Sequence, residues 1–237
     1  MSMPISVDIP GQPGSGIFDE VFDLFRQIDS DFSTYKPESE VSRYQRGELA
    51  LEDASHDFRA VFAACEEYAA ATQGYFSAYF SGTFDPTGYV KGWAIARAAR
   101  FLQDAGTPAF MINAGGDVYV HSTTGRVWNV GLEHPSDKQA LAGTIQIQNG
   151  AVATSGTYAR GQHIIDPHSG QPADSFLSVT VTGPDIVAAD VFATTVFAMG
   201  RKGLDFITRQ PGYQVLCIYP TLEVVRAGAA ANTQNAQ

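Results

Sequence analysis

The sequence predicts a single α+β domain, and three observations support this fold class. Apolar residues recur at helical spacing in some segments and alternate with polar residues in others, so the chain carries both helices and strands. The strand patterns gather in the second half, without the regular βαβ order or the GxGxxG fingerprint of a dinucleotide-binding domain. The 237 residues, 44% of them hydrophobic, can build one substantial core, and no repeat or long linker divides them. We therefore expect one domain over residues 1–227.

The first half of the chain predicts one short strand and three helices. Alternating apolar residues over 5–9 indicate the strand, and the Pro- and Gly-rich residues 10–16 end it. Residues 29–46 are polar with scattered aromatics, and no element is predicted there. Apolar residues at helical spacing predict helices over 17–28, 57–72 and 89–105, the last two closed by Gly74 and Gly106.

The second half predicts strands and one long apolar helix. A tight glycine turn at 113–117 should join two strands, and Asn149-Gly150 is expected to be a hairpin turn. Pro184 should open a helix that runs to Met199, because Pro is favoured in a first helical turn. A short helix is expected near 204–209, and residues 228–237 should form a disordered tail. Alternation predicts the strands near 110–112, 118–120, 127–132, 144–148, 151–154, 178–182, 214–219 and 223–226.

The charge balance excludes some classes of partner. Fifteen Lys and Arg residues against 25 Asp and Glu give a net charge of -10, which argues against a nucleic-acid-binding surface. An anionic ligand would therefore need a local device such as a metal ion, a helix N-terminus or backbone N–H groups. Two distant cysteines, Cys65 and Cys217, exclude a disulfide framework and are expected to be small buried hydrophobes. No signal sequence or membrane-spanning stretch occurs, so we expect a cytoplasmic protein without a membrane anchor.

Asp190 and Thr194 form a candidate metal-binding pair. They lie four positions apart in the predicted helix 184–199, and therefore on one face of it. The helix is otherwise apolar, and a buried carboxylate is costly unless it is paired or bound to a cation. No Lys or Arg between Ile186 and Gly200 can pair it locally, and a carboxylate with a hydroxyl suits Mg²⁺. The alternative is a solvated Asp190 on an exposed face, with Thr194 bonded back into its own helix.

Residues 85–92, Asp-Pro-Thr-Gly-Tyr-Val-Lys-Gly, stand at the start of a predicted helix. Free N–H groups and the helix dipole favour an anion there. Gly88 allows its carbonyl to approach a metal, and Lys91 can neutralise a phosphate. The alternative is an ordinary Asp-Pro cap followed by a solvated lysine.

Two further segments collect polar groups. Residues 113–117, Asn-Ala-Gly-Gly-Asp, either bring backbone against a ligand or form only a turn. Residues 153–168 gather hydroxyls, His163 and Asp166 after a predicted strand. His163 is either a general base near neutral pH or a structural side chain. Ser155 lacks the GxSxG surroundings of a serine hydrolase.

Six segments taken together identify a family. In chain order they are Ser33-Thr34-Tyr35 with Ser39-Glu40, then residues 85–92, 113–117, 153–156, 163–167 and 189–194. In this order, from about Met3 to Gly200, the chain resembles the ApbE-type flavin transferases, the FAD:protein FMN transferases. The resemblance implies a single ApbE-like domain of mixed sheets packed with helices.

The resemblance also implies an activity. Members of the family transfer the FMN moiety of FAD to a Ser or Thr hydroxyl of a target protein, require Mg²⁺ and release AMP. FAD is then the substrate, and the metal offsets the charge that an acidic protein would oppose to a pyrophosphate. Two other functions stay open. One is an FAD diphosphatase that uses water and yields FMN and AMP, and the other is a protein that binds or delivers FAD without cleaving it.

The resemblance assigns roles to individual residues. Asp190, Thr194 and the Gly88 carbonyl match the metal ligands, and Asp85 matches the acidic residue that holds the adenosine part of FAD. His163 matches the histidine that activates the acceptor hydroxyl, with Asp166 as its orienting partner. The remaining contacts with the flavin, adenine or phosphates fall on Met3, Tyr35, Gly74, Tyr75, Phe76, Lys91, Ser155 and Gly156.

The chain departs from the family pattern at two places. The usual Gly-Gly-x-Ala-Lys-Gly reads Thr87-Gly88-Tyr89-Val90-Lys91-Gly92, so the start of this helix is bulkier. Ser77 stands where many members carry Asp after Gly-Ala-Phe, which removes any role of that carboxylate. The Asp-Gly dipeptide that begins the family's acceptor pattern is absent, so self-modification is not expected.

Overall fold

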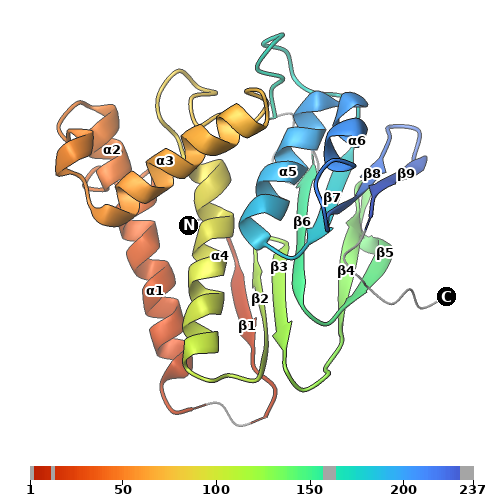
Figure 1. Cartoon of the computed structure of the whole chain (residues 1–237), viewed down its shortest axis with the longest axis horizontal. Helices are drawn as coiled ribbons and strands as arrows, with labels where there is room; N and C mark the ends of the chain where they lie inside the picture. Colours follow the sequence, from red (N-terminus) through yellow and green to blue (C-terminus); the bar gives the residue numbers. More distant parts are fainter. Residues whose placement is uncertain (1–2, 12–13, 157–163, 230–237) are drawn as a thin grey trace.

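The computed structural model describes residues 3–11, 14–156 and 164–229, and it places a layer of helices against a large β-sheet (Figure 1). The helices are α1 (Ile17–Phe32), α2 (Glu40–Gln45), α3 (His56–Ala71), α4 (Thr87–Asp104), α5 (Ile186–Met199) and α6 (Lys202–Ile207), with a short 3₁₀ turn at Leu51–Asp53. The strands are β1 (Ile5–Asp8), β2 (Ala109–Ala114), β3 (Asp117–Ser122), β4 (Trp128–His134), β5 (Asp137–Ile147), β6 (Gly150–Gly156), β7 (Ser178–Gly183), β8 (Gln214–Ile218) and β9 (Val224–Gly228). The predicted α+β class with mixed helices and sheets is confirmed.

Seven strands form one sheet in the order β1-β2-β3-β6-β7-β8-β9, and every neighbouring pair is antiparallel. The remaining two strands, β4 and β5, pair only with each other in a second sheet of two strands. The chain leaves the large sheet after β3, forms β4 and β5, and returns to the large sheet at β6. The centre of the large sheet therefore joins strands that are not consecutive in the chain.

Alternation along the strands divides the interior into two cores. In β6, Ala151 and Ala153 face the helices, whereas Val152 faces the opposite side of the sheet. The helix-facing core is completed by apolar residues of α1, α3, α4 and α5. The second core lies under the two-stranded sheet and consists of Val118, Val120, Trp128, Val130, Leu132, Ile147 and Val152. Both faces of the central strands β3 and β6 are thus covered.

Helices α4 and α5 pack at unusually close range. A Cβ built on Gly92 of α4 would lie 3.0 Å from the Cα of Val187 and 3.2 Å from the carbonyl oxygen of Ile186 in α5. Nearly every residue of α5 is buried, because the helix lies between α4, α6 and the sheet. Only a residue without a side chain lets the two helix backbones approach in this way.

Three local predictions are corrected by the structure. Asn149-Gly150 is not a hairpin turn, because β5 and β6 belong to different sheets. Instead, the Asn149 side chain bonds the backbone of Ser122, accepting from its N–H at 2.8 Å and donating to its carbonyl at 3.1 Å. Helix α5 begins after Asp185, whose carboxylate accepts the Ala188 N–H at 2.8 Å, rather than at Pro184. Helix α2 was not predicted, since its six residues are too few to show a period.

The prediction for the two cysteines is confirmed. Cys65 and Cys217 are both buried, and burial raises the pKa of each thiol to about 12. Within residues 3–11, 14–156 and 164–229, none of the helices combines the length and the apolar character needed to cross a bilayer. Most of the predicted tail, residues 230–237, lies outside the described residues.

We expect Gly92→Ala to lower the free energy of unfolding by about 1 kcal/mol. Alanine favours an isolated helix by about 1 kcal/mol over glycine, but overpacking against a neighbouring backbone costs about 1–3 kcal/mol. Chemical denaturation followed by circular dichroism measures the change. Gly143→Ala is the control, because a Cβ there meets nothing within 4 Å. Equal loss in both variants, or none in Gly92→Ala, would contradict the close packing.

Candidate functional site

Asp190 of α5 is a buried carboxylate that faces α4. Its residue is 3% exposed, so the solvated alternative is wrong. One oxygen, Oδ2, accepts the backbone N–H of Gly92 at 3.2 Å, and the other, Oδ1, lies 3.2 Å from the Nζ of Lys91. Helix α5 itself has no Lys or Arg to pair with Asp190, and Lys91 of α4 supplies the cation instead. Lys91 is not the solvated lysine of the alternative interpretation, since its side chain is only 23% exposed.

Asp117 is a second buried carboxylate on the same lysine. It opens β3 directly after Gly115-Gly116 and is 1% exposed. Its Oδ1 accepts the backbone N–H of Thr154 in β6 at 3.0 Å, and its Oδ2 lies 2.5 Å from the Lys91 Nζ. Sequence reasoning considered only the backbone of this turn and missed the carboxylate. The available signal was an acidic residue at the start of an otherwise apolar strand.

The surroundings shift the pKa values of Asp190 and Lys91. Burial raises the pKa of Asp190 to about 7; the nearby Asp117 carboxylate acts in the same direction, and Lys91 opposes both. Burial alone would lower the pKa of the Lys91 ammonium, but Asp117 and Asp190 together raise it above its ordinary value. Lys91 is therefore firmly protonated. With both carboxylates ionised the cluster carries a net charge of one negative unit, which favours an additional cation.

Two hydroxyls stand beside the carboxylates. Ser155 lies on the helix-facing side of β6, and its Oγ is 3.1 Å from the Oγ1 of Thr194, one turn beyond Asp190 in α5. Gly156 follows at the end of β6, opposite Ser178 of β7. Gly88 lies one turn before Gly92 in α4, so its carbonyl points along the helix axis toward Gly92, the residue whose N–H bonds Asp190.

The donor atoms suit a hard divalent cation. A carboxylate, a hydroxyl and a backbone carbonyl are oxygen ligands of the kind that Mg²⁺ takes, with waters and phosphates completing the shell. In the part of the chain that the structure describes, no group of three His, Cys, Asp or Glu side chains is arranged to hold a metal. A site at Asp190 would accordingly rest on mixed ligands.

The segment 72–76 contacts the loop that carries Asp166. Thr72 is fully buried, and its hydroxyl donates to the Tyr68 carbonyl at 2.7 Å and accepts the Phe76 N–H at 3.0 Å. The rings of Tyr75 and His168 lie 4.4 Å apart between centroids, and the His168 Nε2 is 3.0 Å from the Gln73 carbonyl oxygen. These contacts hold Gly74, Tyr75 and Phe76 against residues 166–172.

Asp166 shapes its own turn. Its carboxylate accepts the His168 N–H and the Ser169 hydroxyl, both at 2.9 Å. Partial burial opposes ionisation, but hydrogen bonds from His168 and Ser169 outweigh it and lower the pKa of Asp166. His163, the predicted general base, lies outside the described residues, and so does its predicted pairing with Asp166.

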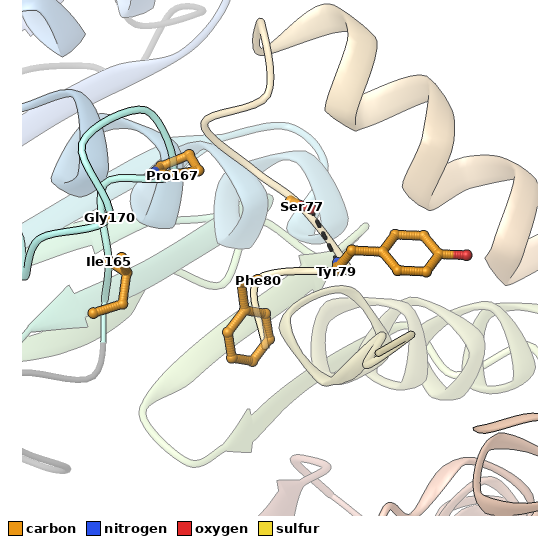
Figure 2. Close-up of a pocket in the computed structure, with 6 residues that line it drawn as sticks. All are labelled: Ser77, Tyr79, Phe80, Ile165, Pro167 and Gly170. Carbon is orange, nitrogen blue, oxygen red and sulfur yellow. Dashed lines mark hydrogen bonds between the residues drawn. The ribbon is translucent and has the colours of Figure 1, made fainter. Parts of the chain in front are cut away.

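A small pocket opens between these loops. It has a volume of about 190 Å³ and is lined by Ser77, Tyr79, Phe80, Ile165, Pro167 and Gly170. Figure 2 shows Ser77, Tyr79 and Phe80 on one loop segment. Ile165 and Pro167 lie on the loop across from it. Ser77 is thus at the wall of the pocket. Phe80 is 54% exposed, whereas the Tyr79 ring points away from Ile165 and Pro167 and packs on Phe84, with 5.7 Å between ring centroids.

The other predicted contact residues occupy different surroundings. Asp85 stands at the base of the pocket loop, where its N–H donates to the Ala78 carbonyl at 2.6 Å and its carboxylate accepts the Thr87 N–H. Met3 packs on the glycine turn before Asp117, since a Cβ on Gly115 would lie 2.8 Å from the Met3 sulfur. Tyr35 is 87% exposed between α1 and α2, and no interaction among the described residues links it to Asp190.

The family model described as the ApbE family matches residues 1–83 and 81–217 of the chain. The chain belongs to the ApbE family. An FAD:protein FMN transferase of Klebsiella pneumoniae (strain 342) is 38% identical over 146 residues, which are 57% of this chain and 45% of that protein. One of Escherichia coli (strain K12) is 28% identical over 140 residues, 54% of this chain and 40% of that protein. The chain thus aligns with somewhat under half the length of these relatives.

Solved structures of ApbE proteins share the fold. The flavin transferase ApbE from Vibrio cholerae superposes with a TM-score of 0.81 at 24% identity, over 96% of this chain and 94% of that one. The ApbE protein from Thermotoga maritima gives a TM-score of 0.82 at 21% identity, over 95% and 93%. The architecture around Asp190 is therefore that of an ApbE domain.

We expect Thr72→Val to lower the free energy of unfolding by about 1–3 kcal/mol, because it leaves the buried Phe76 N–H without its acceptor. Thermal melting and chemical denaturation measure the loss. Thr208→Val is the control, because its exposed hydroxyl also donates to a helix carbonyl. A stable Thr72→Val protein would show that Thr72 does not hold the segment.

Proposed function

We propose that this protein transfers the FMN moiety of FAD to a Ser or Thr hydroxyl of a target protein, with Mg²⁺ and with release of AMP. The observation that carries the proposal is the buried Asp190 carboxylate, one turn before the Thr194 hydroxyl and in contact with Lys91. Membership of the ApbE family and the names of its relatives support the same activity.

The residues at this centre divide the tasks of holding and neutralising a pyrophosphate. Asp190, Thr194 and the Gly88 carbonyl would hold Mg²⁺, which when bound neutralises phosphate charge and stabilises the transition state of phosphoryl transfer. Lys91 lies beside Asp190 and would place its ammonium on a phosphate oxygen. Ser155 and Gly156, at the end of β6, would contact the FMN side of the substrate.

The remaining groups would orient the flavin, the adenosine and the acceptor. Aromatic residues on the 74–80 segment offer flat apolar surfaces to a ring system, and Asp85 at the base of that loop would bind the adenosine part. His163 would accept the proton of the target hydroxyl. The hydroxyl oxygen then bonds to the FMN-side phosphorus, the bond from that phosphorus to the bridging oxygen breaks, and AMP leaves with the bridging oxygen.

The decisive assay incubates the protein with FAD, Mg²⁺ and an acceptor protein that carries the family's target motif. AMP release and the intact mass of the acceptor are followed together. A gain of one FMN on the acceptor supports transfer. AMP with free FMN and an unmodified acceptor would point to a diphosphatase, and bound but uncleaved FAD would point to a carrier.

Asp190→Asn should reduce transfer by about 100-fold or more, because the loss of several kcal/mol of charge stabilisation at the metal costs a factor of ten per 1.4 kcal/mol. The control is Asp205→Asn, which removes an exposed carboxylate of α6 and leaves the same net charge. Transfer at the wild-type rate by Asp190→Asn would remove Asp190 from the metal site.

A further inference from the structure

Lys91 lies where a cation bound to Asp190 would lie. The Oδ2 atom of Asp190 already accepts the Gly92 N–H, so Oδ1 is the oxygen with more capacity for a metal ion. That oxygen faces the Lys91 Nζ at 3.2 Å. A divalent cation and the ammonium would therefore compete for one side of one carboxylate, and they would repel each other across it.

Asp117 gives the lysine an alternative partner. The Nζ atom is already closer to Asp117 Oδ2, at 2.5 Å, than to Asp190 Oδ1. Among the described residues, Asp117 Oδ2 is a buried oxygen whose recorded partner is the Lys91 ammonium, so this contact compensates its charge. The carboxylate itself is fixed, because its Oδ1 accepts the Thr154 N–H. Lys91 can therefore move away from Asp190 and still keep the Asp117 carboxylate as its counter-charge.

The lysine is also able to reach solvent. Its side chain is 23% exposed, whereas those of Asp117 and Asp190 are 1% and 4% exposed. A phosphate group that arrives from solvent would therefore meet the lysine side chain before it meets either carboxylate. The long flexible stem of lysine permits such a move, and its ammonium interacts well with phosphate oxygens.

We propose that Lys91 is an internal counter-ion that occupies the cation position of Asp190 until a phosphate-bearing ligand draws its ammonium away from Asp190, while Asp117 remains its partner. Metal and anionic substrate then bind cooperatively at this centre, each favouring the other. Lys91 acts here as a positioning residue for the metal, and Asp117 holds it when it moves. The inference rests on the proposed function, because it takes the metal and FAD to share this site.

The first test titrates Mn²⁺ into protein without nucleotide and measures the free ion by electron paramagnetic resonance. Lys91→Gln should bind Mn²⁺ about tenfold more tightly than the wild type, because Asp190 loses its competing cation. Arg97→Gln is the matched control, since it removes a positive charge from the same helix, where Arg97 pairs with Asp57 at 2.8 Å. Equal or weaker Mn²⁺ binding by Lys91→Gln, or no binding by either protein, would overturn the proposal.

A second measurement gives the coupling between the ligands. The dissociation constant of FAD is determined once in EDTA and once with saturating Mn²⁺. The constant in EDTA divided by the constant with Mn²⁺ measures the cooperativity. The ratio should fall in Lys91→Gln by the factor by which its Mn²⁺ affinity rises. Asp117→Asn should weaken nucleotide-free Mn²⁺ binding more in the wild type than in the Lys91→Gln background. Equal ratios in wild type and Lys91→Gln would contradict the coupling.

The wild-type protein offers a test that does not depend on the folding of a variant. The ¹⁵N signal of the Lys91 ammonium should shift when FAD is added in EDTA, since the phosphates draw the lysine before any metal arrives. An unchanged signal with bound FAD would refute the movement. These binding readouts separate the two proposals, because a protein that binds Mn²⁺ at Asp190 but transfers no FMN would overturn only the proposed function.

Discussion

The Lys91 ammonium joins two buried carboxylates that come from different layers of the molecule, and the arrangement of the centre depends on that junction. Asp190 belongs to a helix whose surroundings are almost wholly apolar, and Asp117 opens a central strand. Neither charge would be tolerated there alone, because desolvation of an unpaired carboxylate costs several kcal/mol. The pairing therefore links α4, α5 and β3 and sets their relative positions.

The approach of α4 to α5 makes this pairing possible. Gly92 has no side chain, so its N–H reaches the Asp190 carboxylate directly, while the preceding residue, Lys91, reaches around to the other oxygen. Lys91 and Gly92, two successive residues of α4, thus contact the two carboxylate oxygens of Asp190 in α5. The same turn of α4 begins with Gly88, so the backbone that would ligate a metal is positioned by the contact that fixes its carboxylate.

Much of the fold is predictable from periodicity, and the exceptions have physical causes. The long helices have enough turns to display an apolar stripe, whereas α2 has six residues and is held by the Ser39 cap, so no period is visible. Asn149-Gly150 has the local chemistry of a hairpin turn, but strand pairing is decided by tertiary contacts. Pairing of β6 with β3 and β7 overrides the local signal.

The candidate site is predictable in part for the same reason. The spacing of Asp190 and Thr194 is local, so their common face can be derived from the helix alone. The partner of Asp190 lies 99 positions earlier in the chain, at Lys91, and no spacing rule connects them. Asp117 has no local partner either, because its contacts with Thr154 and Lys91 exist only after the sheet and helices have assembled.

The excursion through β4 and β5 has a consequence for how the domain can vary. Its two ends are tied together by the Asn149 side chain, which bonds both backbone groups of Ser122 at a separation of 27 positions. Loop-closure entropy grows only slowly with length, by about 0.6 kcal/mol for each doubling. Residues inserted at the tip of this excursion would therefore cost little, and the clamp at its base would keep them from disturbing the register of β3 and β6. The domain can acquire additional residues at this point while the side that carries Asp190 and Lys91 stays as it is.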